Sequence, residues 1–292
     1  AACRLADGVA TITCACAEVG QGFVTLVQQI AHEVLGAQEV VLEPASTETI
    51  GSAGSTSASR QTWMSGGAVQ KAGEEGGARL LARVADEHGV ELDGLVLVDG
   101  LVASLTGDLE VDLVSATSDP IHAEVEFRHA PTSPLDEDGQ GDAHVSFAFS
   151  AHRAIVDVDV GLGLVKVVEL TTSQDVGRVL NPVQVVGQLE GGAAQGVGLA
   201  VMEEVQLSDG RIRNASFTDY LVPTALDMPP VEIAALIEQP EPGAPFGAKG
   251  VGEPPTITST AAVAAAIRAA TGLALPRVPV RPSDIVFGGG AA

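Results

Sequence analysis

The chain has 292 residues and a formal net charge of −23. Such an acidic excess disfavours nucleic acid and anionic membrane surfaces as partners, because both carry negative charge themselves. Hydrophobic residues make up 46% of the chain and aromatic residues only 3%, so we predict a core built mainly from Ala, Val and Leu. The length fits one large domain or two ordinary ones.

Hydrophobic periodicity divides the first half of the chain into strands and helices. Apolar side chains recur at helical spacing from Phe23, and Gly36 is the kind of residue that commonly ends a helix. A loop of mostly Ser, Thr and Gly residues follows at 47–61. The predicted elements of this half are a strand at 9–17, a helix at 23–35, a strand at 39–43, a helix at about 62–88, and strands at 94–98 and 123–127.

The second half is predicted to follow a polar, acidic loop at 130–142. Gly161-Leu162-Gly163 has the composition of a hairpin turn. The helix after Asn181-Pro182 contains five glycines, which indicate close contact with another backbone or a ligand. The predicted elements are strands at 143–160 and 164–171, a helix at 183–205, a strand at 231–237 and a helix at 255–271.

These elements lack the regular alternation that builds a doubly wound sheet, so we predict an α+β fold with mixed sheets packed against helices. The polar loop is the expected boundary if the chain divides. The predicted parts are a first α+β portion at 1–130, a surface loop at 131–142, and a second α+β portion at 143–292 that carries Glu253.

The three cysteines, Cys3, Cys14 and Cys16, are too few and too close together to indicate a disulfide framework. Neither they nor the six histidines have metal-ligand spacing, so packed thiols in a reducing compartment are expected. The sequence shows no signal peptide and no apolar run long enough to span a bilayer. We therefore expect a cytoplasmic protein.

The strongest functional signal is Gly247-Ala248-Lys249-Gly250-Val251-Gly252-Glu253-Pro254-Pro255, directly before an Ala-rich helix. Glycines permit close approach, and prolines stiffen the backbone around the carboxylate. Because a proline follows it, Glu253 is predicted to be extended, with the helix opening at Pro255 or Thr256. This setting suits a general base that is partly buried, although an exposed acid favouring the helix dipole is the alternative.

Three further segments offer polar groups to a ligand. The backbone N–H groups of Gly20-Gln21-Gly22 lie between a strand and a helix, where they can bind an anion or a polar cofactor edge. The hydroxyl-rich run 54–62 can pack against a polar ligand, but a flexible linker has the same composition. Gln188 lies about two turns into the helix that Asn181-Pro182 begins.

Together these segments resemble the molybdenum hydroxylases, the family of xanthine dehydrogenase and aldehyde oxidase. The Glu253 loop resembles the family's catalytic-glutamate loop, and residues 18–23 resemble the turn whose glutamine contacts the pterin. Residues 56–61 match a segment that wraps the molybdopterin, and 175–191 match one that presents a glutamine to the metal's oxo ligand. The resemblance covers residues 8–284 approximately and is weak between 91 and 143.

The resemblance implies a set of site residues. Glu253 is the implied general base, and Gln188 is expected near the oxo ligand of a molybdenum ion that no protein side chain binds directly. The implied cofactor is molybdenum on molybdopterin, expected in its cytosine dinucleotide form. The implied contacts to it are Gly20, Gln21, Gly22, Thr56, Ser57, Ala58, Ser59, Arg60, Gln61, Gln188, Gly250, Val251 and Gly252.

The resemblance also implies a reaction. Members hydroxylate an electron-poor carbon, here expected in a purine or another N-heteroaromatic compound, with water as the oxygen source. Electrons leave through 2Fe-2S clusters and FAD. The chain resembles the C-terminal half of the molybdenum-binding region, so partner subunits are expected to carry the N-terminal half, the 2Fe-2S clusters and FAD.

Several alternatives stay open at this point. Aldehyde, nicotinate and carbon monoxide dehydrogenases belong to the same family. The chain also suits a non-catalytic scaffold subunit, or a stand-alone acidic binding domain.

Overall fold

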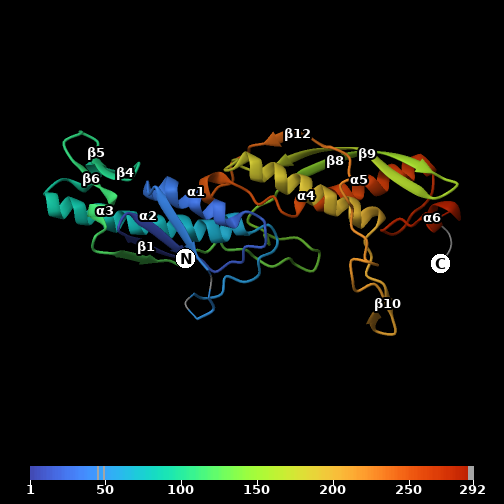
Figure 1. Ribbon diagram of the computed structural model, residues 1–292, viewed down its shortest axis with the longest axis horizontal. Helices are drawn as coiled ribbons and strands as arrows, with labels where there is room; N and C mark the ends of the chain where they lie inside the picture. The colour runs from blue at the N-terminus through green and yellow to red at the C-terminus, as the bar shows by residue number, and fades with distance from the viewer. Residues whose placement is uncertain (45, 49, 289–292) are drawn as a thin grey trace. The chain divides into compact units, whose positions relative to one another are not determined.

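The computed structural model describes residues 1–44, 46–48 and 50–288, and the chain forms two compact units (Figure 1). Unit 1 consists of Ala1–Phe147 and Pro240–Gly250. Unit 2 consists of Ala148–Gln239 and Val251–Ala292. Both units combine sheets with helices, so the predicted α+β class is confirmed.

The main sheet and long helices of unit 1 are β1 (Ala2–Ala6), β2 (Val9–Thr13), α1 (Phe23–Leu35), β3 (Glu39–Glu43), α2 (Gln61–His88) and β7 (Ile121–Glu124). The sheet order is β3-β2-β1-β7. The strand β1 is antiparallel to both neighbours, whereas β2 and β3 are parallel and are joined through α1. A parallel pair needs such a crossover connection. The 20–22 turn therefore lies directly before the crossover helix α1, between it and β2.

Smaller elements complete unit 1: η1 (Leu92–Gly94), β4 (Leu95–Val98), β5 (Leu101–Ser104), β6 (Glu110–Asp112), α3 (Leu113–Ala116) and η2 (Pro245–Gly247). The strands β4, β5 and β6 form an antiparallel sheet. The 3-10 helix η2 contacts α2, although residues 89–244, which include the first stretch of unit 2, separate them in sequence.

The core of unit 1 explains why α2 tolerates its glycines. A Cβ on Gly67 would lie 2.8 Å from the ring of Phe127, and one on Gly73 would lie 3.1 Å from Val34 on α1. The close approach buries a cluster of apolar side chains, and its burial offsets the loss of helix propensity at glycine.

The cysteines lie in this part of the chain, and all three are free thiols. Cys3 and Cys14 are buried as predicted, and burial raises the pKa of Cys3 to about 12. Cys16 is half-buried and shares a hydrogen bond with Cys14, which raises the pKa of Cys16 and lowers that of Cys14.

Unit 2 contains β8 (Ser150–Asp159), β9 (Leu164–Asp175), α4 (Pro182–Val201), β10 (Leu207–Ser208), β11 (Arg211–Ile212), β12 (Val231–Ile237), α5 (Pro254–Thr271) and α6 (Pro282–Val286). Its main sheet has the order β12-β9-β8, with β8 and β9 as an antiparallel hairpin and β12 parallel to β9. Figure 1 shows α4 and α5 running beside one another, and their contact is one of the most extensive in the unit. Asn181 caps α4 as predicted, because its side chain accepts the N–H of Gln184.

Several predicted bounds are wrong, for reasons that lie in pairing. The strand predicted at 143–160 begins at Ser150, which pairs with Gln174 near the end of β9. The strand predicted at 9–17 ends at Thr13, which pairs with the first residue of β1, Ala2, and with the last residue of β3, Glu43. The strand predicted at 123–127 lies at Ile121–Glu124, opposite β1, and α4 ends at Val201 before the predicted 205.

The division of the chain also differs from the predicted parts 1–130, 131–142 and 143–292. Unit 1 continues to Phe147 and includes Pro240–Gly250. The reason is a buried cluster in which Lys249 Nζ donates to the Phe147 carbonyl at 2.9 Å and pairs with Glu241 at 3.5 Å. Sequence patterns do not reveal a contact between residues 102 positions apart.

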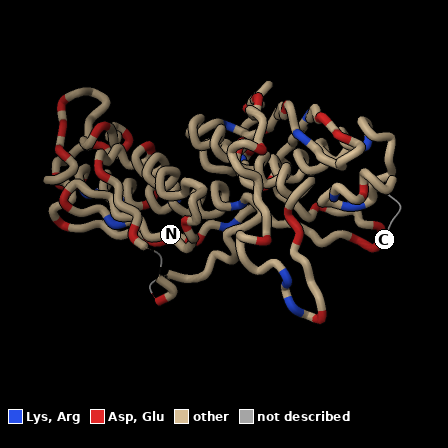
Figure 2. The backbone as a smooth tube through the Cα atoms, turned by 45° about the vertical axis from the view of Figure 1, so that its right-hand side comes forward, with Lys and Arg blue, Asp and Glu red and all other residues tan. Residues whose placement is uncertain are grey.

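Acidic residues are distributed over both units, as Figure 2 shows. In the part of the chain that the structure describes, no helix has both the length and the apolar character of a membrane span.

Four of the five glycines of α4 divide into two kinds. A Cβ on Gly196 would lie 1.8 Å from Ser259 Oγ, and one on Gly192 would lie 2.7 Å from Pro255 Cγ. Gly187 and Gly191 have no atom within 4 Å of such a position. The prediction that these glycines permit close contact with another backbone is therefore confirmed for Gly192 and Gly196, which fix α5 against α4.

We predict opposite effects for alanine at these two kinds of position. Gly196→Ala should lower the free energy of unfolding by about 1–3 kcal/mol, because Ser259 must be displaced. Gly191→Ala should raise it by about 0.5–1 kcal/mol, because alanine is the better helix former and no atom opposes it. Denaturant unfolding of the purified protein measures both, and equal effects would contradict this account of the α4–α5 contact.

Candidate functional site

The turn Gly20-Gln21-Gly22 is held by hydrogen bonds to the carboxylate of Glu18. Gly20 and Gly22 have φ of 98° and 85°, and Gly22 caps α1. Their N–H groups donate to Glu18 Oε1 at 2.7 and 3.3 Å, and the N–H of Val24 donates to Oε2 at 2.9 Å. The prediction that the N–H groups of this turn receive an external anion is therefore wrong for Gly20 and Gly22: Glu18 takes that place.

The electrostatics of Glu18 follow from this arrangement. Burial is the largest single influence and raises its pKa, but the backbone N–H groups of Val24, Gly20, Gly22 and Phe23 together outweigh it and hold the pKa below the usual 4.5. The ionised carboxylate therefore stabilises the start of α1.

We predict that Glu18→Gln lowers the free energy of unfolding by about 0.5–1 kcal/mol at pH 7, a small effect because the side chain is exposed and screened. A depressed folded-state pKa contributes stability above the unfolded value and loses it as pH falls through the folded value. The difference between wild type and variant should thus shrink as pH falls below the usual 4.5 and through the folded-state value. Urea titrations at a series of falling pH values test this, and a difference that does not shrink would contradict it.

Gln21, Thr56 and Gln61 meet around the backbone of Ala17. Gln21 Nε2 donates to the Ala17 carbonyl at 2.9 Å and to Gln61 Oε1, and Gln61 Nε2 donates to Thr56 Oγ1 at 3.2 Å. The Ala17 N–H donates to the same hydroxyl at 3.3 Å. The 20–22 turn and the 56–61 loop, both predicted to contact the cofactor, are therefore joined by hydrogen bonds. The amide nitrogen of Gln21 donates to Ala17 and Gln61 and not to a ligand. Thr56 accepts two bonds here, and its own hydroxyl proton has no acceptor among the residues that the structure describes.

The segment 53–60 is an ordered loop and not a flexible linker. Arg60 Nη1 donates to the carbonyls of Ala53 and Ser55 at 2.7 and 3.2 Å. Ala58 and Ser59 have φ of 57° and 49°, a left-handed conformation that costs about 1–3 kcal/mol in each residue without a glycine. Such strain is common where a loop is shaped for a ligand.

Gly250 belongs to the same cluster. A Cβ on Gly250 would lie 1.6 Å from the carbonyl oxygen of Ser59, so only glycine fits. Within unit 1 the structure thus brings together the predicted residues of the 20–22 turn, the 56–61 loop and Gly250.

We predict that Gly250→Ala displaces the loop at Ser59 and lowers the cofactor content of the purified protein several-fold, in line with the severity of a backbone clash. Gly51→Ala is the matched control, because no atom lies within 4 Å of a Cβ there. Molybdenum analysis of both variants is the measurement. Full molybdenum content in Gly250→Ala would remove Gly250 from the site.

Glu253 and Gln188 belong to unit 2, and the loop passes from unit 1 to unit 2 between Gly250 and Val251. Glu253 has φ −96° and ψ −34°, so the predicted extended conformation is wrong. A following proline disfavours the helical region without forbidding it, and the Glu253 carbonyl gains the N–H groups of Thr256 and Ile257 at 3.0 and 3.2 Å. The helix therefore begins at Pro254, earlier than predicted, with Glu253 as its N-cap residue.

The exposure of these two side chains differs. Glu253 is exposed in this chain by itself, although a general base was expected to be partly buried. Gln188 is half-buried on α4, and no hydrogen bond joins its amide to another described residue. Gly187 and Gly191 leave open space along the same helix. Val251 is half-buried and Gly252 exposed.

The residues that fix the start of α5 could not be identified from the sequence. The hydroxyl oxygens of Ser150 and Thr258 each lie 3.2 Å from the Pro254 carbonyl oxygen. His152 Nδ1 lies 2.7 Å from Thr258 Oγ1, and burial lowers the pKa of this histidine. These contacts depend on the register of β8 against α5, for which the sequence carries no signal.

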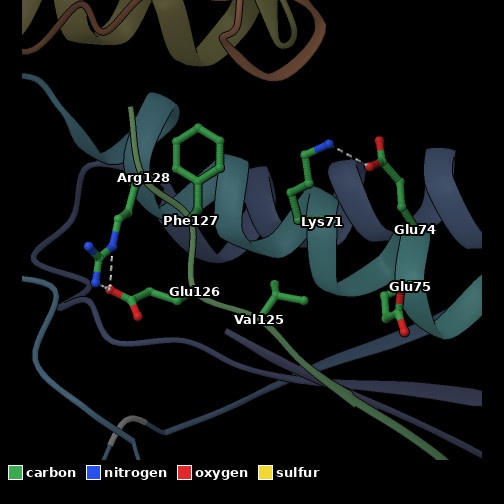
Figure 3. Close-up of a pocket in the computed structure, with 7 residues that line it drawn as sticks. All are labelled: Lys71, Glu74, Glu75, Val125, Glu126, Phe127 and Arg128. Atoms are coloured by element: carbon green, nitrogen blue, oxygen red, sulfur yellow. Dashed lines mark hydrogen bonds and ion pairs between the residues drawn. The ribbon is translucent and has the colours of Figure 1, made fainter. Parts of the chain in front are cut away.

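A separate hollow of about 650 Å³ lies in unit 1 (Figure 3). It is lined by Lys71, Glu74, Glu75, Val125, Glu126, Phe127 and Arg128. Lys71 pairs with Glu74 at 3.3 Å and Arg128 pairs with Glu126 at 2.7 Å. None of the predicted site residues lines it, and these charges are already paired, so it is not the candidate site.

Comparison with known proteins decides the family. A family model described as the molybdopterin cofactor-binding domain matches residues 3–229. The chain belongs to this family. The predicted membership of the molybdenum hydroxylases is thereby confirmed.

Several relatives of this molybdopterin cofactor-binding domain are known. The chain is 31% identical to a protein of Bacillus subtilis named as a probable xanthine dehydrogenase subunit, over 96% of this chain and 37% of that protein. It is 32% identical to the gamma subunit of the 6-hydroxypseudooxynicotine dehydrogenase complex of Paenarthrobacter nicotinovorans, over 95% and 36%. The crystal structure of quinoline 2-oxidoreductase from Pseudomonas putida matches with TM-score 0.83 and 27% identity, over 99% and 38%. The chain thus spans little more than a third of these relatives.

The residues present fit a molybdopterin. The cofactor is polar and needs hydrogen-bond partners and close backbone approach. In unit 1, the hydroxyl proton of Thr56 has no acceptor among the described residues. In unit 2, the amide of Gln188 has no partner among the described residues, and Gly187 and Gly191 leave room along the same helix. The strained loop at Ala58 and Ser59 places small side chains at an exposed edge.

Proposed function

We propose that this chain forms one side of the active site of a molybdopterin-dependent, xanthine dehydrogenase-like hydroxylase, with Glu253 as the general base. The observation that carries the proposal is that the exposed side chain of Glu253 stands on a fixed stretch of backbone. Its side chain is exposed, whereas Pro254 and Pro255 behind it are fixed against β8 and α4. A carboxylate on so rigid a backbone can be presented to a substrate with little loss of conformational entropy.

Local geometry supports each proposed cofactor contact. Thr56 to Gln61 offer hydroxyl and backbone groups, with Arg60 holding the loop, and Gln188 offers its amide. Gly20, Gln21 and Gly22 contribute indirectly, because the amide of Gln21 donates a hydrogen bond to Gln61 and so holds the 56–61 loop in place. Gly250, Val251 and Gly252 carry the chain from this loop to Glu253.

The bound molybdenum–pterin group supplies two-electron redox chemistry and activates water as the oxygen source. The chain contributes proton transfer. A Glu253 carboxylate oxygen accepts the proton released as oxygen derived from water adds to an electron-poor carbon. In this chain alone the carboxylate is exposed, so the water exclusion that strengthens such a base comes from residues outside it.

The names of the relatives support an N-heteroaromatic substrate, because xanthine and quinoline are both compounds of that kind. The chain spans about a third of its relatives, so we assign the N-terminal half of the molybdenum-binding region, the 2Fe-2S clusters and FAD to residues outside it. We further assign the cytosine dinucleotide form of molybdopterin.

We predict that Glu253→Gln in the assembled enzyme lowers kcat by about 10²–10⁴-fold, the usual contribution of a general base. Gln keeps the size of the side chain and removes its basicity. Asp157→Asn is the matched control, because Asp157 is an exposed carboxylate of the same unit on β8. Steady-state turnover and molybdenum content are measured together.

Full turnover in Glu253→Gln, at full molybdenum content, would overturn the catalytic assignment and favour a scaffold subunit. Absence of molybdenum from the wild-type assembly would overturn the cofactor assignment as well.

A further inference from the structure

A polar cluster inside unit 2 surrounds the start of α5. It consists of Ser150 and His152 on β8, Gln174 on β9, Thr258 on α5 and the carbonyl of Pro254. Gln174 is 1% exposed, and its Nε2 donates to Ser150 Oγ at 2.9 Å. A threonine hydroxyl bonded to the carbonyl four residues earlier is common in helices. The convergence of two β8 side chains on the same groups is specific to this site.

The number of protons in the cluster decides the tautomer of His152. If the carbonyl contact, the hydroxyl–hydroxyl contact and the Thr258–His152 contact are all hydrogen bonds, one hydroxyl proton, from Ser150 or Thr258, goes to the Pro254 carbonyl. The contact between the two hydroxyl groups requires the other hydroxyl proton. No hydroxyl proton is then left for the contact between Thr258 Oγ1 and His152 Nδ1, so Nδ1–H must be the donor.

The other ring nitrogen agrees with this assignment. His152 Nε2 is buried and has no hydrogen-bond partner among the described residues. A neutral ring with its proton on Nδ1 leaves only a weakly solvated lone pair there. A second proton on Nε2 would place an unpaired charge in the same buried position, which is more costly.

We propose that His152 is a positioning residue for Glu253: its Nδ1–H, acting through Thr258 and Ser150, fixes the carbonyl of Pro254 and with it the preceding residue. This inference rests on the proposed role of Glu253. Pro254 follows Glu253 directly, and the Glu253 carbonyl accepts the N–H groups of Thr256 and Ile257. Loosening the Pro254 carbonyl therefore loosens the first turn of α5 and displaces the carboxylate.

Two substitutions separate hydrogen bonding from packing. His152→Asn places an amide nitrogen near the position of Nδ1 and keeps the donor, whereas His152→Leu keeps apolar volume and removes it. Both are made in the assembled holoenzyme. The first readout is amide hydrogen exchange of the peptide containing Thr256 and Ile257, which does not depend on turnover. The second is kcat and KM for the substrate, with molybdenum content as a check.

We expect His152→Leu to speed exchange at these amides about 2- to 10-fold, the equivalent of one lost hydrogen bond. We expect kcat to fall about 10- to 100-fold with little change in KM, because a misplaced base affects the chemical step. His152→Asn should keep both properties near wild type. Equal behaviour of the two variants, or unchanged exchange in His152→Leu, would overturn the proposal.

Failure of this inference differs from failure of the proposed function. If Glu253→Gln abolishes turnover while His152→Leu changes neither exchange nor kcat, Glu253 is the base and His152 does not position it. If Glu253→Gln keeps turnover, the base assignment fails. The exchange measurement then still shows whether the cluster fixes the first turn of α5, but the positioning role falls with the base.

Discussion

The close approach of two helix backbones governs the geometry of unit 2. At Gly192 and Gly196, α4 lies so near α5 that a single methyl group would collide with Pro255 or Ser259. Steric contact of this kind is short-ranged and steep, so it fixes position more sharply than apolar burial alone. The position of the first turn of α5, and therefore of Glu253, depends on two glycines in α4. Their weak helix propensity is the accompanying cost.

Polar contacts then refine what the packing sets. Hydroxyl groups from both β8 and α5 lie 3.2 Å from the Pro254 carbonyl oxygen, so sheet and helix meet at one atom. Unit 1 has a similar arrangement at Ala17: its N–H donates to Thr56, and its carbonyl accepts hydrogen bonds from Gln21 and Gln61. In both places side chains hydrogen-bond to backbone groups and fix the local course of the chain. Glu18 extends the pattern, because it satisfies the start of α1 from within the chain.

The features predicted correctly from the sequence are those that depend on residues close together in the chain. Helical spacing from Phe23, the Asn181-Pro182 start and the turn at 161–163 depend on neighbouring residues, and all three occur as predicted. The conformation of Glu253 was missed because two backbone hydrogen bonds outweigh the preference that a following proline imposes. The role of Glu18 was open to prediction, since an acid two residues before a Gly-x-Gly turn can cap the next helix. The contacts of His152 and Lys249 depend on residues far apart in the chain, and no local pattern encodes them.

The interleaved course of the chain has a consequence for how this protein can be dissected or evolve. Each unit is assembled from two separate stretches, because Pro240–Gly250 returns to unit 1 before the chain resumes unit 2. No single cut separates the two units: a cut after Phe147 leaves Pro240–Gly250 with unit 2, and a cut after Gly250 leaves Ala148–Gln239 with unit 1. Gene fission or fusion that preserves both units must act outside the span from Phe147 to Gly250, which leaves the two units inseparable by simple domain shuffling.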